Sequence, residues 1–290
     1  MNDARYGLQF LSVKAFGDFV IAATSLERAA PEDRARLSIL AGDHLRPLAE
    51  AVSPACGLTF LGSGISGVPA IFDTRRAGAR AAIRSATMLR RAVRQARDRS
   101  TTLVLDKNGW RERWLATPQG ALALPTARNI YAAYDAFLAA AGIVFEGSVS
   151  AKGGAMVDAV VGLFPGSRVA AKNLPFHVVR AALAAIARSG KHARLFLLEG
   201  ERPDLEHSDL PFEMVPRRFE ALIAAVDSVG SVIGADSLPA HLAERAGRPV
   251  FVLSPRPNIF WLPRSSLAHD HWAVFDADLD LSLARFLDVK

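Results

Sequence analysis

Residues 231–255, SVIGADSLPAHLAERAGRPVFVLSP, carry the pattern that decides the fold. Two short runs of β-branched and apolar residues, Ser231–Ile233 and Pro249–Leu253, enclose an alanine-rich stretch with helical spacing, Pro239–Ala246. A strand, a helix and a second strand in this order are typical of a βαβ unit, whose two strands run parallel. The segment therefore predicts an α/β protein.

The same alternation extends over the rest of the chain. Further strands are expected at Gln9–Val13, Leu37–Leu40, Leu58–Leu61, Thr102–Leu105, Ala159–Phe164 and Ala193–Leu198. Helical patterns cover Phe19–Arg28, Ile130–Ala141, Phe176–Ser189 and Phe219–Ala225. A doubly wound sheet of this kind binds its ligands outside the carboxyl ends of the strands, so the loops that follow the strands are the places to look for chemistry.

The length predicts two domains. A chain of 290 residues is longer than a single core usually organises, and a composition of 50% hydrophobic and 22% charged residues excludes a disordered protein. The stretch Glu146–Gly154, EGSVSAKGG, is small and polar without periodicity, as linkers are. We therefore expect domains at 1–150 and 155–275, followed by a helix at 276–290, for which packing against the first domain is one arrangement.

Cysteine content and hydropathy indicate the cellular compartment in which the protein is expected. The single cysteine, Cys56, excludes an internal disulfide and a cysteine-based zinc site. No apolar run approaches the roughly 20 residues of a membrane helix, and the first residues, MNDARYGLQF, lack the apolar core of a signal peptide. The sequence predicts a cytoplasmic protein.

The positive charge is concentrated in one segment. The net charge is +6, yet nine arginines and one acid lie between Arg75 and Arg99. Several of these arginines recur at helical spacing: Arg76, Arg80, Arg84, Arg90 and Arg94. The segment predicts one or two basic amphipathic helices. Three interpretations remain open: a solvated helix face, a surface for anionic lipid headgroups or a phosphorylated acceptor, and a nucleic-acid surface, for which no recognisable motif is present.

Two loops carry candidate functional groups in the expected places. After the first strand, Gly17 would let the backbone approach a ligand, and Asp18 would either cap the following helix or act as a general base. After the strand that ends at Phe164, the turn Gly166-Ser167 and the cation of Lys172 can meet phosphate oxygens. This second loop lacks the spacing of a Walker motif, and an ordinary loop with Lys172 in solvent is the alternative.

Two further loops complete the set. Several acids follow the predicted strand that ends at Leu198, and Glu199, Glu201 or Asp204 could accept hydrogen bonds from a ribose. In the opening segment, Asp236 and Ser237 precede a helix whose first turns contain His241. A hydroxyl and an imidazole beside the partial positive charge of a helix N-terminus predict a diphosphate site.

Three of these loops together resemble the heptosyltransferase family, glycosyltransferase family 9. The segment ADSLPAHLAERAGRPVFVLSP is similar to the family's D-[ST]-G-x-x-H-[LI]-A helix start and following G-x-P strand. PGSRVAAKNLP is similar to its G-[ST]-x(4)-K-x-[WL]-P loop, and KAFGDFVIAATSL to its amino-terminal G-D turn. The resemblance covers nearly the whole chain and implies a GT-B fold: two Rossmann-like domains that face each other across a cleft, with the acceptor on the first and the nucleotide sugar on the second.

The resemblance also implies an activity: inverting transfer of a heptose-like sugar to a lipopolysaccharide or another anionic surface glycan. It implies ADP-heptose as the donor, no required metal, no nucleic acid as a partner, and a cytoplasmic enzyme with a possible peripheral contact at the inner membrane. A catalytically silent binding protein of the same pathway is the alternative.

The resemblance assigns roles to individual residues. Asp18 matches the general base; Ser167 and Lys172 match groups that hold the diphosphate; Asp236, Ser237 and His241 match the sugar and phosphate contacts; and Glu201 matches the acid that holds the ribose, with Glu199 and Asp204 as alternatives. Leu238 departs from the pattern, because the family usually has glycine there. The repeated acids Asp276, Asp278 and Asp280 are interpreted as the cap of a helix rather than a metal motif.

Overall fold

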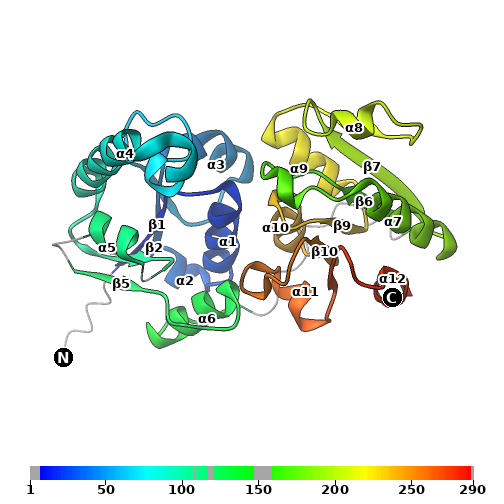
Figure 1. The fold of residues 1–290 in the computed structure, drawn as a ribbon. Helices are drawn as coiled ribbons and strands as arrows, with labels where there is room; N and C mark the ends of the chain where they lie inside the picture. Colours follow the sequence, from blue (N-terminus) through cyan, green and yellow to red (C-terminus); the bar gives the residue numbers. More distant parts are fainter. Residues whose placement is uncertain (1–6, 108, 117–119, 147–158, 289–290) are drawn as a thin grey trace. The chain divides into compact units, whose positions relative to one another are not determined.

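The computed structural model describes residues 7–107, 109–116, 120–146 and 159–288, and these form two compact units (Figure 1). The first unit comprises Met1–Ala127 and Tyr131–Ser148, and the second comprises Arg128–Ile130 and Val149–Lys290. The predicted boundary at residue 150 and the predicted linker, apart from its first residue Glu146, fall in 147–158, outside the described residues.

The first unit is built on a sheet of five parallel strands in the order β3-β2-β1-β4-β5. The strands are β1 Gly7–Ser12, β2 Leu37–Ala41, β3 Gly57–Phe60, β4 Thr101–Leu105 and β5 Ala121–Ala123. The helices are α1 Phe16–Glu27, α2 Pro31–Arg34, α3 Arg46–Val52, α4 Thr74–Ala96, α5 Trp110–Ala116 and α6 Ile130–Ala140, with 3₁₀ turns η1 Asp43–Leu45 and η2 Ala70–Phe72. The strand order reverses between β1 and β4, so the loops after these two strands meet at a switch point.

The second unit is built on six parallel strands in the order β11-β10-β9-β6-β7-β8. The strands are β6 Val160–Phe164, β7 His192–Leu198, β8 Glu213–Val215, β9 Ser231–Ala235, β10 Val250–Ser254 and β11 Trp272–Val274. The helices are α7 Phe176–Arg188, α8 Pro203–Glu206, α9 Phe219–Asp227, α10 Leu238–Arg245, α11 Arg264–Ala268 and α12 Leu279–Asp288, with 3₁₀ turns η3 Ala170–Lys172 and η4 Ile259–Trp261. Here the switch point lies between β6 and β9.

Each unit has its own hydrophobic core. In the first, Leu89 and Val93 of α4 pack on the apolar side chains of β1 and β4. In the second, Val178, Ala182 and Ile186 of α7 recur at helical spacing and are completely buried against the sheet. Because burying one such side chain contributes about 1.5–3 kcal/mol, these stripes decide which face of each helix turns inward.

The carboxyl-terminal helix belongs to the second unit. Leu283 and Phe286 of α12 are part of that unit's core, and α12 packs along α7 and β11. The Asp278 carboxylate accepts a hydrogen bond from the Asp280 amide, at 3.2 Å, at the start of α12. This contact confirms the interpretation of the repeated acids as a helix cap.

The α/β fold class is confirmed, and all eight predicted strands are present. The prediction missed β5, β8 and β11, three-residue strands at the sheet edges. It also placed the start of α1 too late: the helix begins at Phe16, so Gly17 lies inside its first turn and not before it.

Candidate functional site

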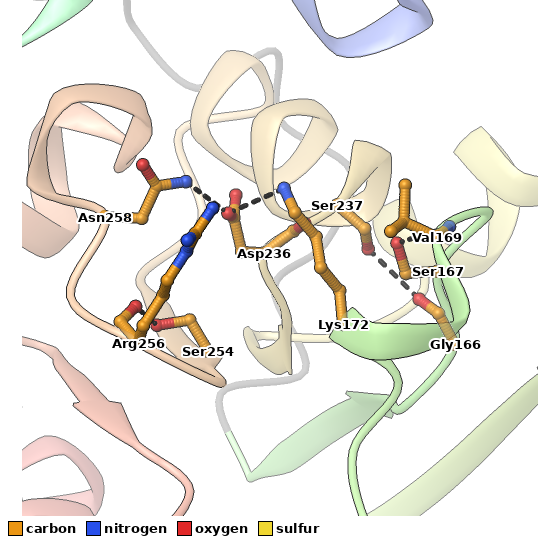
Figure 2. Close-up of polar contacts among 9 residues, drawn as sticks. All are labelled: Gly166, Ser167, Val169, Lys172, Asp236, Ser237, Ser254, Arg256 and Asn258. Atoms are coloured by element: carbon orange, nitrogen blue, oxygen red, sulfur yellow. Dashed lines mark hydrogen bonds and ion pairs between the residues drawn. The ribbon is translucent and has the colours of Figure 1, made fainter. Parts of the chain in front are cut away.

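In the second unit, the loops after β6 and β9 meet through an ion pair. The ammonium of Lys172 lies 2.8 Å from Oδ2 of Asp236 and 3.3 Å from the Asp236 backbone oxygen (Figure 2). Asp236 follows β9, and Lys172 ends the turn η3 that follows β6. The structure thus brings together a cation and a carboxylate 64 residues apart in the sequence, at the switch point.

Asp236 has a second partner that the sequence analysis did not assign. Nδ2 of Asn258, in the loop after β10, donates a hydrogen bond of 2.7 Å to the same carboxylate oxygen. Arg256 is exposed in the same loop, and its backbone oxygen accepts a hydrogen bond of 2.7 Å from Ser254 (Figure 2). Three strands, β6, β9 and β10, therefore contribute polar groups to one edge of the sheet.

The Gly166-Ser167 turn is held from both sides. The Ser237 hydroxyl donates to the Gly166 backbone oxygen at 3.1 Å, and the Ser167 amide donates to Oδ1 of Asn173 at 2.7 Å. The Ser167 hydroxyl accepts a hydrogen bond from the Val169 amide at 3.3 Å, while its own proton is a further donor. Ser237 is also the N-cap residue of α10, so its hydroxyl ties the two loops together instead of capping the helix.

Of the three candidate ribose acids, Glu201 lies at this turn. A Cβ on Gly166 would collide with the Glu201 carboxylate, so the glycine makes room for it. Burial raises the pKa of Glu201, and the charges of Arg217 and Arg202 oppose that shift. Asp204 is engaged by Arg202 instead, at 2.6 and 2.9 Å, and Glu199 is exposed.

Arg202 holds the start of the Gly166-Ser167 turn through the backbone of Pro165. Its side chain is 4% exposed and donates to the Pro165 backbone oxygen at 3.1 Å. A buried guanidinium on a backbone carbonyl holds the start of the loop in one position. The sequence analysis missed this residue, although it directly follows Glu201.

His241 is the fourth residue of α10, and it interacts electrostatically with both Asp236 and Lys172. It is 5% exposed, and burial lowers its pKa to about 4. The Asp236 carboxylate opposes this shift only in part, and the positive charge of Lys172 adds to it. The imidazole is therefore neutral at pH 7 and offers one donor and one acceptor nitrogen. Leu238, the first residue of α10, is half-buried.

The first unit has its own polar cluster at its switch point. Lys14, after β1, donates to both carboxylate oxygens of Asp106, after β4, at 2.9 Å. Its ammonium also lies 2.6 Å from Oε1 of Glu112 on α5. Burial alone would lower the pKa of Lys14, but the two carboxylates outweigh it and raise that pKa. Neither acid was singled out from the sequence.

Asp18 stands beside this cluster as the third residue of α1. The N-cap residue is Ala15, and Asp18 lies inside the first turn, so Asp18 is not the helix cap that the sequence predicted; its carboxylate accepts a hydrogen bond from the Ala15 amide instead. Burial raises the pKa of Asp18 to about 6, the charge of Asp106 adds to the shift, and Lys14 and Lys107 oppose it. A carboxylate with a pKa of about 6 is mostly ionised at pH 7 and is more basic than an ordinary aspartate, so it can accept a proton.

The predicted arginines lie on α4 of the first unit. Arg80, Arg84 and Arg94 are exposed, and Arg90 lies over the Trp114 ring with its guanidinium carbon 4.8 Å from the ring centre. The side chain of Arg76 lies outside the described residues. Gly78, with φ 77° and ψ 163°, interrupts the helical backbone, in line with the expected one or two basic helices.

Among the described residues, no group of three or more His, Cys, Asp or Glu side chains is arranged to hold a metal ion. Within the same residues, no helix combines the length and the apolar character needed to cross a bilayer.

Comparison with known proteins gives matches to solved structures only, since no protein-family model and no curated protein matches the sequence. A family 9 glycosyl transferase of Veillonella parvula aligns with 93% of this chain and 85% of its own, at 15% identity and a TM-score of 0.59.

Two Escherichia coli proteins align over still more of the chain. The ADP-heptose lipopolysaccharide heptosyltransferase II covers 97% of this chain and 96% of its own, at 14% identity and a TM-score of 0.54. The heptosyltransferase WaaC with ADP covers 97% and 95%, at 10% identity and a TM-score of 0.61. Likeness at such low identity concerns the fold, and we conclude that this chain has the GT-B fold that these glycosyltransferases share.

Proposed function

We propose that the protein is a glycosyltransferase that takes its sugar from a nucleotide diphosphate sugar bound in the second unit. The observation that carries this proposal is the contact of Lys172 with Asp236 at the switch point between β6 and β9, beside the start of α10. A cation and the positive end of a helix at the carboxyl edge of a parallel sheet form a site for the two phosphates.

The proposed donor is ADP-heptose. Two solved structures with this fold are described as heptosyltransferase WaaC with ADP and with ADP-2-deoxy-2-fluoro heptose. In our proposal Lys172 exchanges the Asp236 carboxylate for phosphate oxygens when the donor binds. Glu201 then accepts hydrogen bonds from the ribose, and Asp236 and the neutral His241 contact the sugar or the phosphates.

The proposed chemistry is inversion at the anomeric carbon, with Asp18 as the general base. The Asp18 carboxylate takes the proton of an acceptor hydroxyl, and the hydroxyl oxygen attacks the anomeric carbon from the face opposite the diphosphate. The bond from the anomeric carbon to the diphosphate oxygen breaks, and its electron pair leaves with the nucleotide. Groups already in place around the diphosphate meet the developing charge, which is usually the largest electrostatic contribution to such a reaction.

The proposed acceptor is a hydroxyl of a lipopolysaccharide core or another anionic surface glycan. In this proposal no metal is required, because Lys172 and the N-terminus of α10 neutralise the leaving diphosphate. Transfer is therefore expected to persist in the presence of EDTA.

Calorimetric titration with ADP-heptose tests the donor site. We expect Lys172→Ala to weaken donor binding by at least about tenfold, since charge-assisted contacts with phosphate contribute about 1.5–3 kcal/mol. The matched control is Lys191→Ala, at the turn before β7 and thus at the opposite edge of the same sheet. Unchanged affinity in Lys172→Ala, or no binding of any nucleotide sugar by the native chain, would contradict the proposal.

A transfer assay distinguishes the two candidate functions, a glycosyltransferase and a catalytically silent binding protein. Sugar transfer from ADP-heptose to a lipopolysaccharide core supports an enzyme. Donor binding without transfer to any surface glycan would instead favour a silent binding protein, an interpretation that rests on Leu238 at the first position of α10.

A further inference from the structure

A buried asparagine holds the turn that follows β10. Nδ2 of Asn129 donates to three backbone oxygens, at 2.8 Å for Leu262, 3.2 Å for Ile259 and 3.4 Å for Phe260. Asn129 is 2% exposed, so water does not compete for these contacts. The three carbonyl groups belong to η4 and to the residue that follows it. One side-chain amide therefore fixes the whole turn.

Asn129 comes from an unexpected part of the chain. In the sequence it lies between β5 and α6, two elements of the first unit. By its contacts, the segment Arg128–Ile130 nevertheless belongs to the second unit. The second unit thus takes an anchor from a segment well before its first strand, and a domain boundary at residue 150 would assign that anchor to the other domain.

The turn that Asn129 fixes carries Asn258. This residue directly precedes η4, and its backbone oxygen accepts a hydrogen bond from the Trp261 amide at 3.1 Å. Its side chain points to Asp236 and donates 2.7 Å to Oδ2 (Figure 2). The position of the Asn258 amide depends on η4, and η4 depends on Asn129, so a chain of hydrogen bonds leads from Asn129 to the Asp236 carboxylate.

Asp236 needs this second partner when the donor binds. Lys172 and Asn258 share one oxygen of a carboxylate that is 6% exposed, whereas the Lys172 side chain is 33% exposed and can turn outward. If Lys172 moves to a phosphate, the buried carboxylate loses its cation, which is costly unless another donor stays in place. The Asn258 amide is neutral, so a diphosphate attracts it less than it attracts the ammonium.

We propose that Asn129 is a positioning residue of the donor site. It fixes η4, so that Asn258 keeps the Asp236 carboxylate in place while Lys172 moves to the diphosphate. Asn129 itself is too deeply buried to contact the donor. The effect on the donor rests on the proposed function, whereas the coupling between Asn129 and Asn258 exists in the chain without ligand.

Calorimetry with ADP-heptose tests the effect on the donor. We expect Asn129→Ala and Asn258→Ala each to weaken donor binding by about tenfold, because each removes the support of a hydrogen bond to a charged group. The variant with both substitutions should bind about as well as either single variant, since both act on the same contact. In the transfer assay, the donor KM should rise by about the same factor while kcat stays close to the native value.

Gln9→Ala is the matched control. Gln9 is also 2% exposed, and its side-chain oxygen accepts a hydrogen bond from the Asp98 amide at 3.3 Å in the first unit. The substitution removes an equally buried amide that contacts the backbone. It should reduce stability and leave the donor affinity unchanged.

Two measurements need no ligand. In a chain labelled with fluorotryptophan, the fluorine resonance of Trp261, assigned with Trp261→Phe, should shift in Asn129→Ala and stay in place in Gln9→Ala. In urea unfolding, the variant with Asn129→Ala and Asn258→Ala should lose less stability than the two single variants together.

Three results would overturn the proposal. The first is additive loss of donor affinity, which would show that Asn129 acts independently of Asn258. The second is reduced stability with native donor affinity in Asn129→Ala, as a purely structural role predicts. The third is native donor affinity in Asn258→Ala, which leaves η4 intact and so remains informative if Asn129→Ala does not fold.

Failure of the proposed function gives a different result. A native chain that binds no nucleotide sugar contradicts the donor site, and the unfolding measurements then decide on the positioning of Asp236. Coupled losses of stability in Asn129→Ala and Asn258→Ala support it, and additive losses overturn it.

Discussion

Asp18 combines two properties that usually exclude each other. It sits in the first turn of α1, where a carboxylate stabilises the helix, and yet burial and the charge of Asp106 raise its pKa to about 6. A folded-state pKa above the unfolded value of 3.8 means that the ionised carboxylate destabilises the folded chain above pH 6. This cost disappears as the pH falls below 3.8, because both states are then protonated.

We therefore expect Asp18→Asn to raise the free energy of unfolding at pH 8 by about 1–2 kcal/mol and to lose this gain near pH 4. The same variant should bind the donor normally but abolish transfer. Urea unfolding at the two pH values and a transfer assay measure the two effects. Asp276→Asn, in the exposed turn before α12, is the control and should change neither. A variant that transfers sugar at a near-native rate would remove Asp18 from the mechanism.

Sequence position alone was enough to single out some site residues but not their partners. Lys172 and Asp236 stood out because each follows a strand and lies near glycine, serine or proline. Asn258 and Glu112 carry no local signal, since they act through contacts with residues far away in the sequence. Asp106 could have been found, because it directly follows β4 and the carboxyl end of a strand is where ligand contacts were expected.

At the level of elements, the loop after β6 depends on a glycine. A side chain at position 166 would force the Glu201 carboxylate out of its place. We expect Gly166→Ala to weaken donor binding several-fold and to reduce stability by roughly 1 kcal/mol. Calorimetry with ADP-heptose measures the donor affinity, and thermal unfolding measures the change in stability.

A double variant identifies the cause. If the collision explains the loss, Gly166→Ala should cost less stability in a chain that also carries Glu201→Ala, so the two changes are not additive. Gly67→Ala serves as the control, because a Cβ there would meet no described atom within 4 Å. Additive effects of the two substitutions would show that Glu201 does not confine Gly166.

The elements that the sequence predicted are those with enough residues to show a period. The eight strands found from apolar runs include all the central ones, whose burial leaves a clear pattern. The edge strands β5, β8 and β11 have only three residues each, and three residues cannot establish an alternation. The start of α1 was misplaced because Gly17 disfavours helix, and the core contacts of Phe19 and its neighbours override that preference.

For the whole molecule, the two units should respond differently to ligand. All the proposed donor contacts lie in the second unit, around the loops after β6 and β9. We expect ADP to slow amide hydrogen exchange in peptides over 164–175 and 234–245, with no change in peptides over 12–20. Hydrogen exchange measured by mass spectrometry on the intact chain follows both regions at once. Protection over 12–20 without protection in the second unit would show that the nucleotide binds the first unit, which contradicts the proposed donor site.

The parallel arrangement of both sheets has a kinetic consequence. Every strand pair in the described sheets is parallel, and the central pairs join distant residues: Leu8 lies opposite Thr102, and Val161 lies opposite Ser231. No tight hairpin can nucleate such sheets, so long loops must close before any central pair forms. Refolding from denaturant should accordingly be slow, and incompletely paired intermediates should aggregate more readily as the protein concentration rises.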